Sequence, residues 1–114
     1  MEITKPTGTE VLHLNLHKTW FIMILHGKKL EEYRTLSPYW IQRFDLQKGL
    51  RFNTIRFSNG YASNRPQFDC ELKNIMIGRP FFDWCESNEK HAFILSLGYV
   101  SNMNDEALEL LTQL

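Results

Sequence analysis

Three segments of the chain alternate apolar and polar side chains with a period of two residues. They are Val11–Leu16, Phe52–Ser58 and Phe68–Leu72. This period is typical of strands that bury one face, whereas a helix repeats about every 3.6 residues. Because no regular strand–helix–strand repeat follows, we predict an α+β fold with a small mixed or antiparallel sheet or barrel.

Two further segments, Lys29–Arg34 and His91–Leu97, also have the character of strands. A change of phase near Asn74 indicates a β-bulge in the third alternating segment. About five or six strands are therefore expected.

Two or three short helices should lie between and after the strands. The first spans His17–His26 and ends at Gly27, because glycine favours the left-handed conformation that closes a helix. The second spans Tyr39–Phe44 and follows a Ser-Pro pair suited to a helix start. Asn104 can cap a third helix near the C-terminus.

The 114 residues suffice for one domain. We expect a loose arm over residues 1–10, the domain itself over residues 11–100, and a C-terminal helical extension of the same domain over residues 101–114. No apolar run approaches the roughly 18 residues of a membrane span, and the N-terminus lacks a signal-peptide pattern. The sequence thus predicts a cytoplasmic protein with no membrane partner. The oligomeric state stays open, because the apolar face of the last helix can pack on its own domain or on a second copy.

No metal ion or cofactor is expected. The histidines and cysteines lack the spacing of metal sites; they are His13, His17, His26, His91, Cys70 and Cys85. The chain also lacks the glycine-rich loops that hold nucleotide phosphates.

The net charge of zero hides an asymmetry along the chain. Residues 18–79 contain 11 Lys and Arg against 5 Asp and Glu, whereas the remainder contains 2 against 8. A basic middle suggests a surface that faces an anion, and chance clustering of solvated charges is the alternative.

The pattern Gly-x-Lys-x-x-Glu-x-Arg lies in this basic stretch, at Gly27, Lys29, Glu32 and Arg34. Five neighbouring segments accompany it in order: His17–Phe21, Tyr39-Trp40, Arg56-Phe57, Asn59–Tyr61 and Phe93–Gly98. Together they resemble the small bacterial and phage-type members of the ASCH domain family, over roughly residues 11–100. The resemblance implies a PUA-like β-barrel.

The resemblance also implies a cleft beside the barrel that binds RNA or a modified nucleotide. Carried over by position, Lys29, Glu32 and Arg34 line this cleft and Gly27 permits the turn before them. Further ligand-binding candidates from the resemblance are Lys18, Arg56, Asn59 and Tyr61.

Some members of the family are hydrolases, which implies an alternative function. One branch deacetylates N4-acetylcytidine and another is assigned ribonuclease activity. The deacetylating branch has threonine where this chain has Glu32, so that reaction is disfavoured here, although Glu86 or Glu89 can supply a second carboxylate. The alternative is a hydrolase of RNA or a modified nucleoside that uses Lys29 and Glu32. A catalytic lysine needs a neutral amine, and the neighbouring Glu32 favours the charged form instead.

The motif residues suit binding chemistry without any family. Glu32 and Arg34 share one face of a strand. Arg34 can grip a phosphate or base edge, Lys29 can add a point charge, and Glu32 can accept hydrogen bonds from an amine or a ribose hydroxyl. The alternative is an ion-pair network that only holds the strand.

Aromatic side chains are interleaved with the basic residues between positions 33 and 57, a combination that suits single-stranded RNA. Tyr39 and Tyr61 are the better candidates for base stacking, whereas Trp40, Phe44 and Phe57 should be core. Phe81, Phe82 and Trp84 form a second aromatic cluster, which either covers the barrel end or makes the protein an interaction module with a protein partner.

Overall fold

The computed structural model describes residues 3–85 and 90–112. Its strands are β1 (Pro6–Asn15), β2 (Glu31–Arg34), β3 (Leu50–Ser58), β4 (Gln67–Gly78) and β5 (Ala92–Ser101). Its α-helices are α1 (Lys18–Leu25), α2 (Pro38–Phe44) and α3 (Asp105–Leu111), and two 3-10 turns, η1 (Leu46–Lys48) and η2 (Phe82–Trp84), complete it. No helix in this part of the chain is long and apolar enough to cross a membrane.

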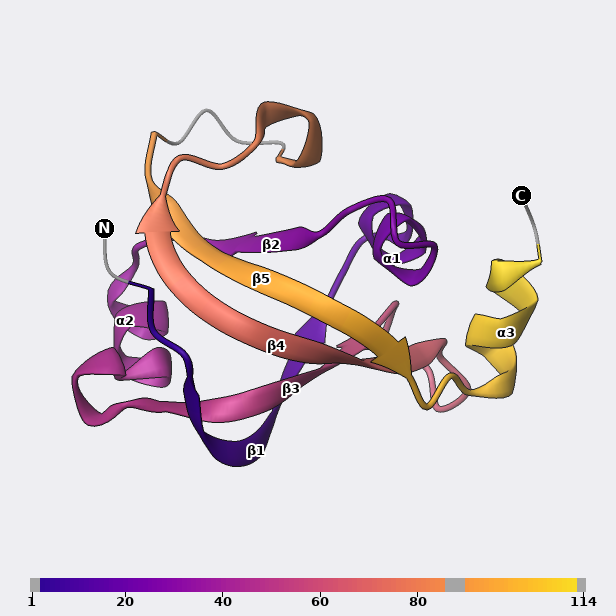
Figure 1. Ribbon diagram of the computed structural model, residues 1–114. Coiled ribbons are helices and arrows are strands. Elements are labelled where there is room, and N and C mark those ends of the chain that lie inside the picture. Colours follow the sequence, from indigo (N-terminus) through magenta and orange to yellow (C-terminus); the bar gives the residue numbers. More distant parts are fainter. Residues whose placement is uncertain (1–2, 86–89, 113–114) are drawn as a thin grey trace.

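The strands form one mixed sheet in the order β1-β3-β4-β5-β2 (Figure 1). β1 runs parallel to β3, and the other neighbours are antiparallel. The predicted α+β class is therefore confirmed. The predicted barrel is not, because β1 and β2 remain the two edges of an open sheet within the described residues.

The core lies between one face of the sheet and the helices. It takes alternate residues of the strands, such as Leu12 and Leu14 of β1 and Ile55 and Phe57 of β3. Phe21 of α1 meets Phe68 of β4 edge-on, with ring centroids 4.8 Å apart. The helices supply further buried residues: Ile24, Leu25, Phe44, Ala107 and Leu110.

The expected loose arm over residues 1–10 is wrong for its second half. β1 already begins at Pro6, and Thr4 pairs with Ile75 of β4. The polar residues before Val11 carry no alternating apolar signal, so the sequence pattern does not reveal this part of the strand. Gly8 makes the pairing possible, because a Cβ there would lie 2.5 Å from the carbonyl oxygen of Arg51.

The turn after α1 is a glycine-terminated helix cap, as predicted. Gly27 has φ +74°, its N–H donates to the Ile24 carbonyl, and the Lys28 N–H donates to the Met23 carbonyl. This pair of bonds is the Schellman motif, which closes the helix and reverses the chain. The reversal turns Lys29 toward the interior.

Gly27→Ala is expected to destabilise the protein by about 1 kcal/mol. An alanine at this φ pays the left-handed penalty, roughly 1–2 kcal/mol, and no atom lies within 4 Å to add a clash. Urea unfolding measures the change, and Gly27→Asn should recover part of it because asparagine tolerates this conformation. An alanine variant as stable as the wild type would contradict the assignment of strain to this position.

Candidate functional site

The motif residues form a buried chain of charges. Lys29 Nζ donates to Glu32 Oε1 at 2.6 Å, and Arg34 Nη2 donates to Glu32 Oε2 at 2.8 Å. Lys29 is 1% exposed and Glu32 is 6% exposed, whereas the Arg34 side chain keeps 21% of its surface. One carboxylate thus bridges two cations, and the group carries a net positive charge.

The edge strand β2 places two members of this group. Glu32 lies opposite Leu95 and Arg34 opposite Phe93, both of which are buried residues of β5. Side chains paired across an antiparallel ladder lie on the same face. Glu32 and Arg34 therefore project from the sheet edge toward the core side.

Aromatic rings surround the two cations. Lys29 Nζ lies 5.3 Å from the ring centroid of Trp20 and 5.4 Å from that of Tyr33. The Arg34 guanidinium carbon lies 5.2 Å from the Trp40 ring centroid. These separations permit cation–π attraction, which is stronger at desolvated sites.

Arg34 also links the two edges of the sheet. Its Nη2 approaches the carbonyl oxygen of Asn15, the last residue of β1, at 3.4 Å. Its Nε is buried and has no hydrogen-bond partner among the described residues. A buried N–H without a partner carries a desolvation cost, so this donor can gain from a ligand acceptor.

A cavity of about 270 Å³ opens beside this group, and we call it the motif pocket. The described residues that line it are Asn15, Leu16, His17, Trp20, Glu32, Tyr33, Arg34, Trp84 and Cys85. Its walls therefore come from the end of β1, from α1, from β2 and from η2. Lys29 lies behind this surface and supports Glu32.

Tyr33 ties the η2 segment to β2. Its hydroxyl donates to Glu31 Oε1 at 2.7 Å and accepts from the Phe81 N–H at 3.1 Å. Burial raises the pKa of Tyr33, and the hydrogen bond to Glu31 raises it further. The hydroxyl stays protonated and fixes the backbone at Phe81, three residues before Trp84.

The other described residues that were predicted for the site do not line the motif pocket. Lys18 on α1 and Tyr39 on α2 are exposed and lie outside the set that lines the motif pocket. Asn59 Nδ2 donates to the Leu16 carbonyl at 2.9 Å. Tyr61 lines a neighbouring cavity. Glu86 and Glu89 lie outside the described residues.

Arg56 lies on the opposite face of the sheet, since Ile55 and Phe57 beside it are core. It pairs with Asp69 through two bonds, of 2.7 and 3.1 Å, and Asn102 donates to the same carboxylate at 3.0 Å. The hydrogen bonds from Arg56 lower the pKa of Asp69, against the effect of burial.

Asp69→Asn is expected to remove part of the acid sensitivity of the fold. The ion pair stabilises the protein above the usual aspartate pKa of 3.8, and this contribution is lost as the pH falls through the lowered pKa. The stability difference between wild type and variant should therefore shrink between about pH 5 and pH 2. Urea unfolding across this range measures the difference, and a constant difference would contradict the lowered pKa.

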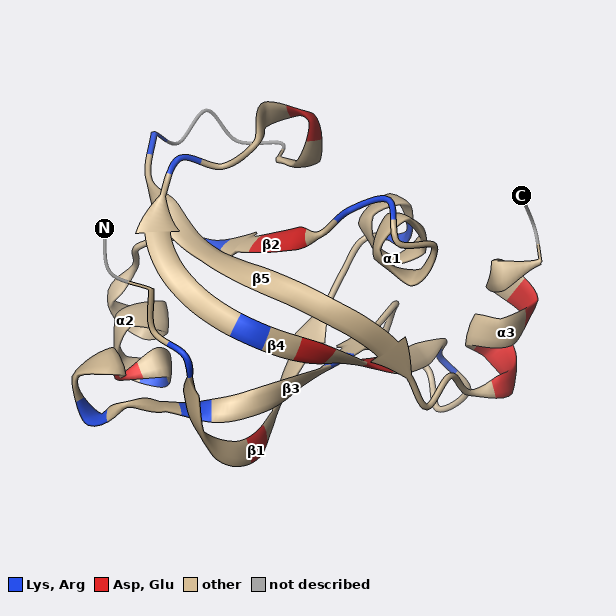
Figure 2. Cartoon of the chain, viewed as in Figure 1, with Lys and Arg blue, Asp and Glu red and all other residues tan. Residues whose placement is uncertain are grey.

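The basic stretch does not form one continuous stripe (Figure 2). Its cations are distributed over several elements and several pair locally, for example Lys48 with Asp45 at 3.6 Å and Arg51 with Glu10 at 3.7 Å.

The predicted core roles of Phe44 and Phe57 are confirmed, and Trp40 packs against the core.

Three residues that the sequence did not predict for the site line the motif pocket: Asn15, His17 and Trp20. The sequence did indicate that His17 and Trp20 lie close together, because residues three apart at the start of a helix share one face. It gave no such indication for Asn15, since its position depends on how the sheet edges approach each other. Trp84 was expected at a barrel end or a partner surface, and the structure places it in the motif pocket.

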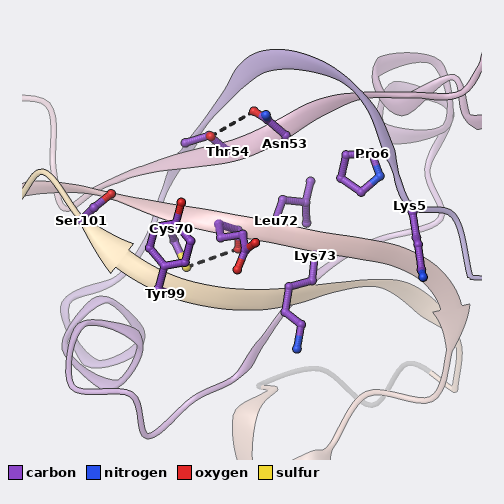
Figure 3. Close-up of a pocket in the computed structure, with 10 residues that line it drawn as sticks. Lys5, Pro6, Asn53, Thr54, Cys70, Leu72, Lys73, Tyr99 and Ser101 are labelled. Atoms are coloured by element: carbon purple, nitrogen blue, oxygen red, sulfur yellow. Dashed lines mark hydrogen bonds between the residues drawn. The ribbon is translucent and has the colours of Figure 1, made fainter.

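A larger cavity, of about 500 Å³, lies over the middle of the sheet (Figure 3). Lys5 and Lys73 border one end, and Tyr99 and Ser101 border the other. Both lysines and Tyr99 are exposed, so this hollow lacks the buried charge of the motif pocket.

Within residues 3–85 and 90–112, no cluster of His, Cys, Asp and Glu could hold a metal ion.

Comparisons with protein-family models, with curated proteins and with solved structures give no match to this chain. The geometry of the motif pocket is therefore the basis for any functional conclusion.

Proposed function

We propose that the protein binds single-stranded RNA or a modified nucleotide, with one base held in the motif pocket. The observation that carries this proposal is the buried Lys29–Glu32–Arg34 chain, which presents a carboxylate and a guanidinium to a pocket walled by aromatic rings.

Buried charge is expensive, and buried ion pairs are weak stabilisers compared with apolar packing. Such a group in a pocket is a candidate functional site for that reason. Glu32 can accept a hydrogen bond from an exocyclic amine, while Arg34 can donate to a base edge or a phosphate. The net positive charge of the three residues favours an anionic ligand.

The shape of the pocket agrees with this chemistry. Trp20 and Trp84 line it, and aromatic side chains are the usual platforms for unpaired bases. Its volume of about 270 Å³ lies just below the range of roughly 300–1,000 Å³ typical of small-molecule sites. A single base fits that scale better than a large cofactor.

We also propose that the open sheet corresponds to the PUA-like barrel of the ASCH family. The support is the resemblance of the motif segments, together with the approach of β1 and β2 at the Arg34–Asn15 contact. In such a barrel, the Arg34 side chain would join β1 to β2 in place of backbone pairing, and the motif pocket would lie between these two strands.

The geometry favours binding over hydrolysis by Lys29. A catalytic group must reach the reacting atoms, and Lys29 Nζ is buried behind Glu32.

The alternative of a protein-docking module rests on Phe81 and Phe82, which border a groove of about 640 Å³ on another side of η2.

A matched pair of variants within η2 tests the proposal. Trp84 lines the motif pocket, whereas Phe82, 81% exposed, lines only the outer groove. A labelled pool of single-stranded RNA is run with each variant on native and denaturing gels. Trp84→Ala should weaken binding about tenfold, the size of one lost stack, and Phe82→Ala should leave it unchanged.

Intact RNA on the denaturing gel is the expected result. RNA shortened by the wild type would favour the nuclease alternative, and loss of binding in Phe82→Ala alone would place the contact outside the motif pocket. Binding should also weaken steeply as salt rises, because phosphate contacts release counterions.

A further inference from the structure

A second cavity adjoins the motif pocket. We call it the loop pocket; its volume is about 350 Å³, and it is lined by His13, Leu14, Asn15, Ser58, Gly60, Tyr61 and Arg65. Asn15 lines both cavities. The two pockets therefore share one wall, at the end of β1.

The loop that carries this pocket is held in place by hydrogen bonds. The Gly60 N–H donates to Asn15 Oδ1 at 2.9 Å, with Gly60 at φ +93°. Asn59 donates to the Leu16 carbonyl, and Asn104 Nδ2 donates to the Arg65 carbonyl at 2.9 Å. A site held in this way loses little conformational entropy when a ligand binds.

The loop pocket offers one aromatic ring, Tyr61, and one guanidinium, Arg65. Tyr61 is 87% exposed, so its ring is available for stacking. Arg65 uses part of its guanidinium on the Ala62 carbonyl, at 3.0 Å. His13 also lines the cavity.

We propose that the loop pocket binds the nucleotide next to the one in the motif pocket, so that the natural ligand is a strand of RNA and not a free nucleotide. This inference rests on the proposed function. Tyr61 stacks on the neighbouring base, Arg65 contacts its phosphate, and the backbone crosses the shared wall at Asn15. Of the residues expected to line one cleft, Glu32 and Arg34 line the motif pocket and Tyr61 lines the loop pocket.

The test compares two probes on the same variants. One probe is a labelled single-stranded RNA pool of about eight nucleotides, within the span that small RNA-binding folds cover. The other is a mixture of the ribonucleoside monophosphates, followed by ligand-observed NMR. Tyr61→Ala and Arg65→Gln should each weaken RNA binding about tenfold and leave monophosphate binding unchanged.

Tyr99→Ala and Lys48→Gln are the matched controls, because they remove an exposed ring and an exposed cation away from both pockets. RNA binding that is unaffected by Tyr61→Ala and Arg65→Gln overturns this inference and leaves the proposed function standing. The inference is also overturned if monophosphates and RNA weaken equally. Wild-type protein that binds neither probe overturns both proposals.

Discussion

Glu32→Ala is expected to destabilise the protein by about 3–5 kcal/mol, the usual cost of leaving a buried charge without its partner. The substitution removes the carboxylate that neutralises Lys29, which is 1% exposed and held at 2.6 Å. It also takes away the acceptor of the Arg34 bond. Urea unfolding followed by circular dichroism measures the change.

A surface carboxylate provides the control for this prediction. Glu10 is mostly exposed and lies 3.7 Å from Arg51, so Glu10→Ala should cost at most about 1 kcal/mol. Adding Lys29→Met to Glu32→Ala should restore part of the lost stability, because the uncompensated ammonium is gone. A Glu32→Ala protein within about 1 kcal/mol of wild type would contradict the buried ion pair.

Arg34→Gln is expected to lower RNA affinity about 10- to 100-fold, which corresponds to the loss of one or two charge-assisted hydrogen bonds. Arg34 lines the motif pocket, and its buried Nε has no hydrogen-bond partner among the described residues. The same variant should lose about 1–3 kcal/mol of stability, because Arg34 also bonds Glu32 and Asn15. Binding is therefore measured well below the unfolding temperature.

Two comparisons separate a specific role from a general charge effect. Lys48→Gln removes an exposed cation elsewhere and should change RNA affinity by less than about twofold. Arg34→Lys keeps the charge but not the planar fork, so it should remain weaker than wild type. If Lys48→Gln and Arg34→Gln weaken binding equally, the interaction is electrostatic only and the motif pocket is not the site.

The local elements of the fold could be predicted because each carries its own signal. Ser37 accepts from the Trp40 N–H at the start of α2, and Asn104 accepts from the Ala107 N–H at the start of α3. The register shifts of β4 between Cys70 and Asn74 correspond to the expected bulge. The parallel pairing of β1 with β3 had no such signal, because it depends on contacts between distant segments.

The site could be predicted only as far as it lies within one segment. Gly27, Lys29, Glu32 and Arg34 are close in sequence, and the turn and strand bring them together. Arg56 was assigned to the same cleft, although the core residues on either side of it direct it to the other face of the sheet. Trp84 lies close to a backbone anchor, the hydrogen bond that the Phe81 N–H donates to the Tyr33 hydroxyl, which no sequence pattern indicates.

The most direct test of RNA binding in the motif pocket is an NMR titration that follows the tryptophan indole N–H signals. The chain has three tryptophans, and Trp20 and Trp84 line the motif pocket. Addition of single-stranded RNA should shift the signals of both until they saturate, and Trp84→Ala should identify one of them. Signals of Trp20 and Trp84 that stay unchanged while RNA binds elsewhere, for example at Tyr99, would contradict the proposed site.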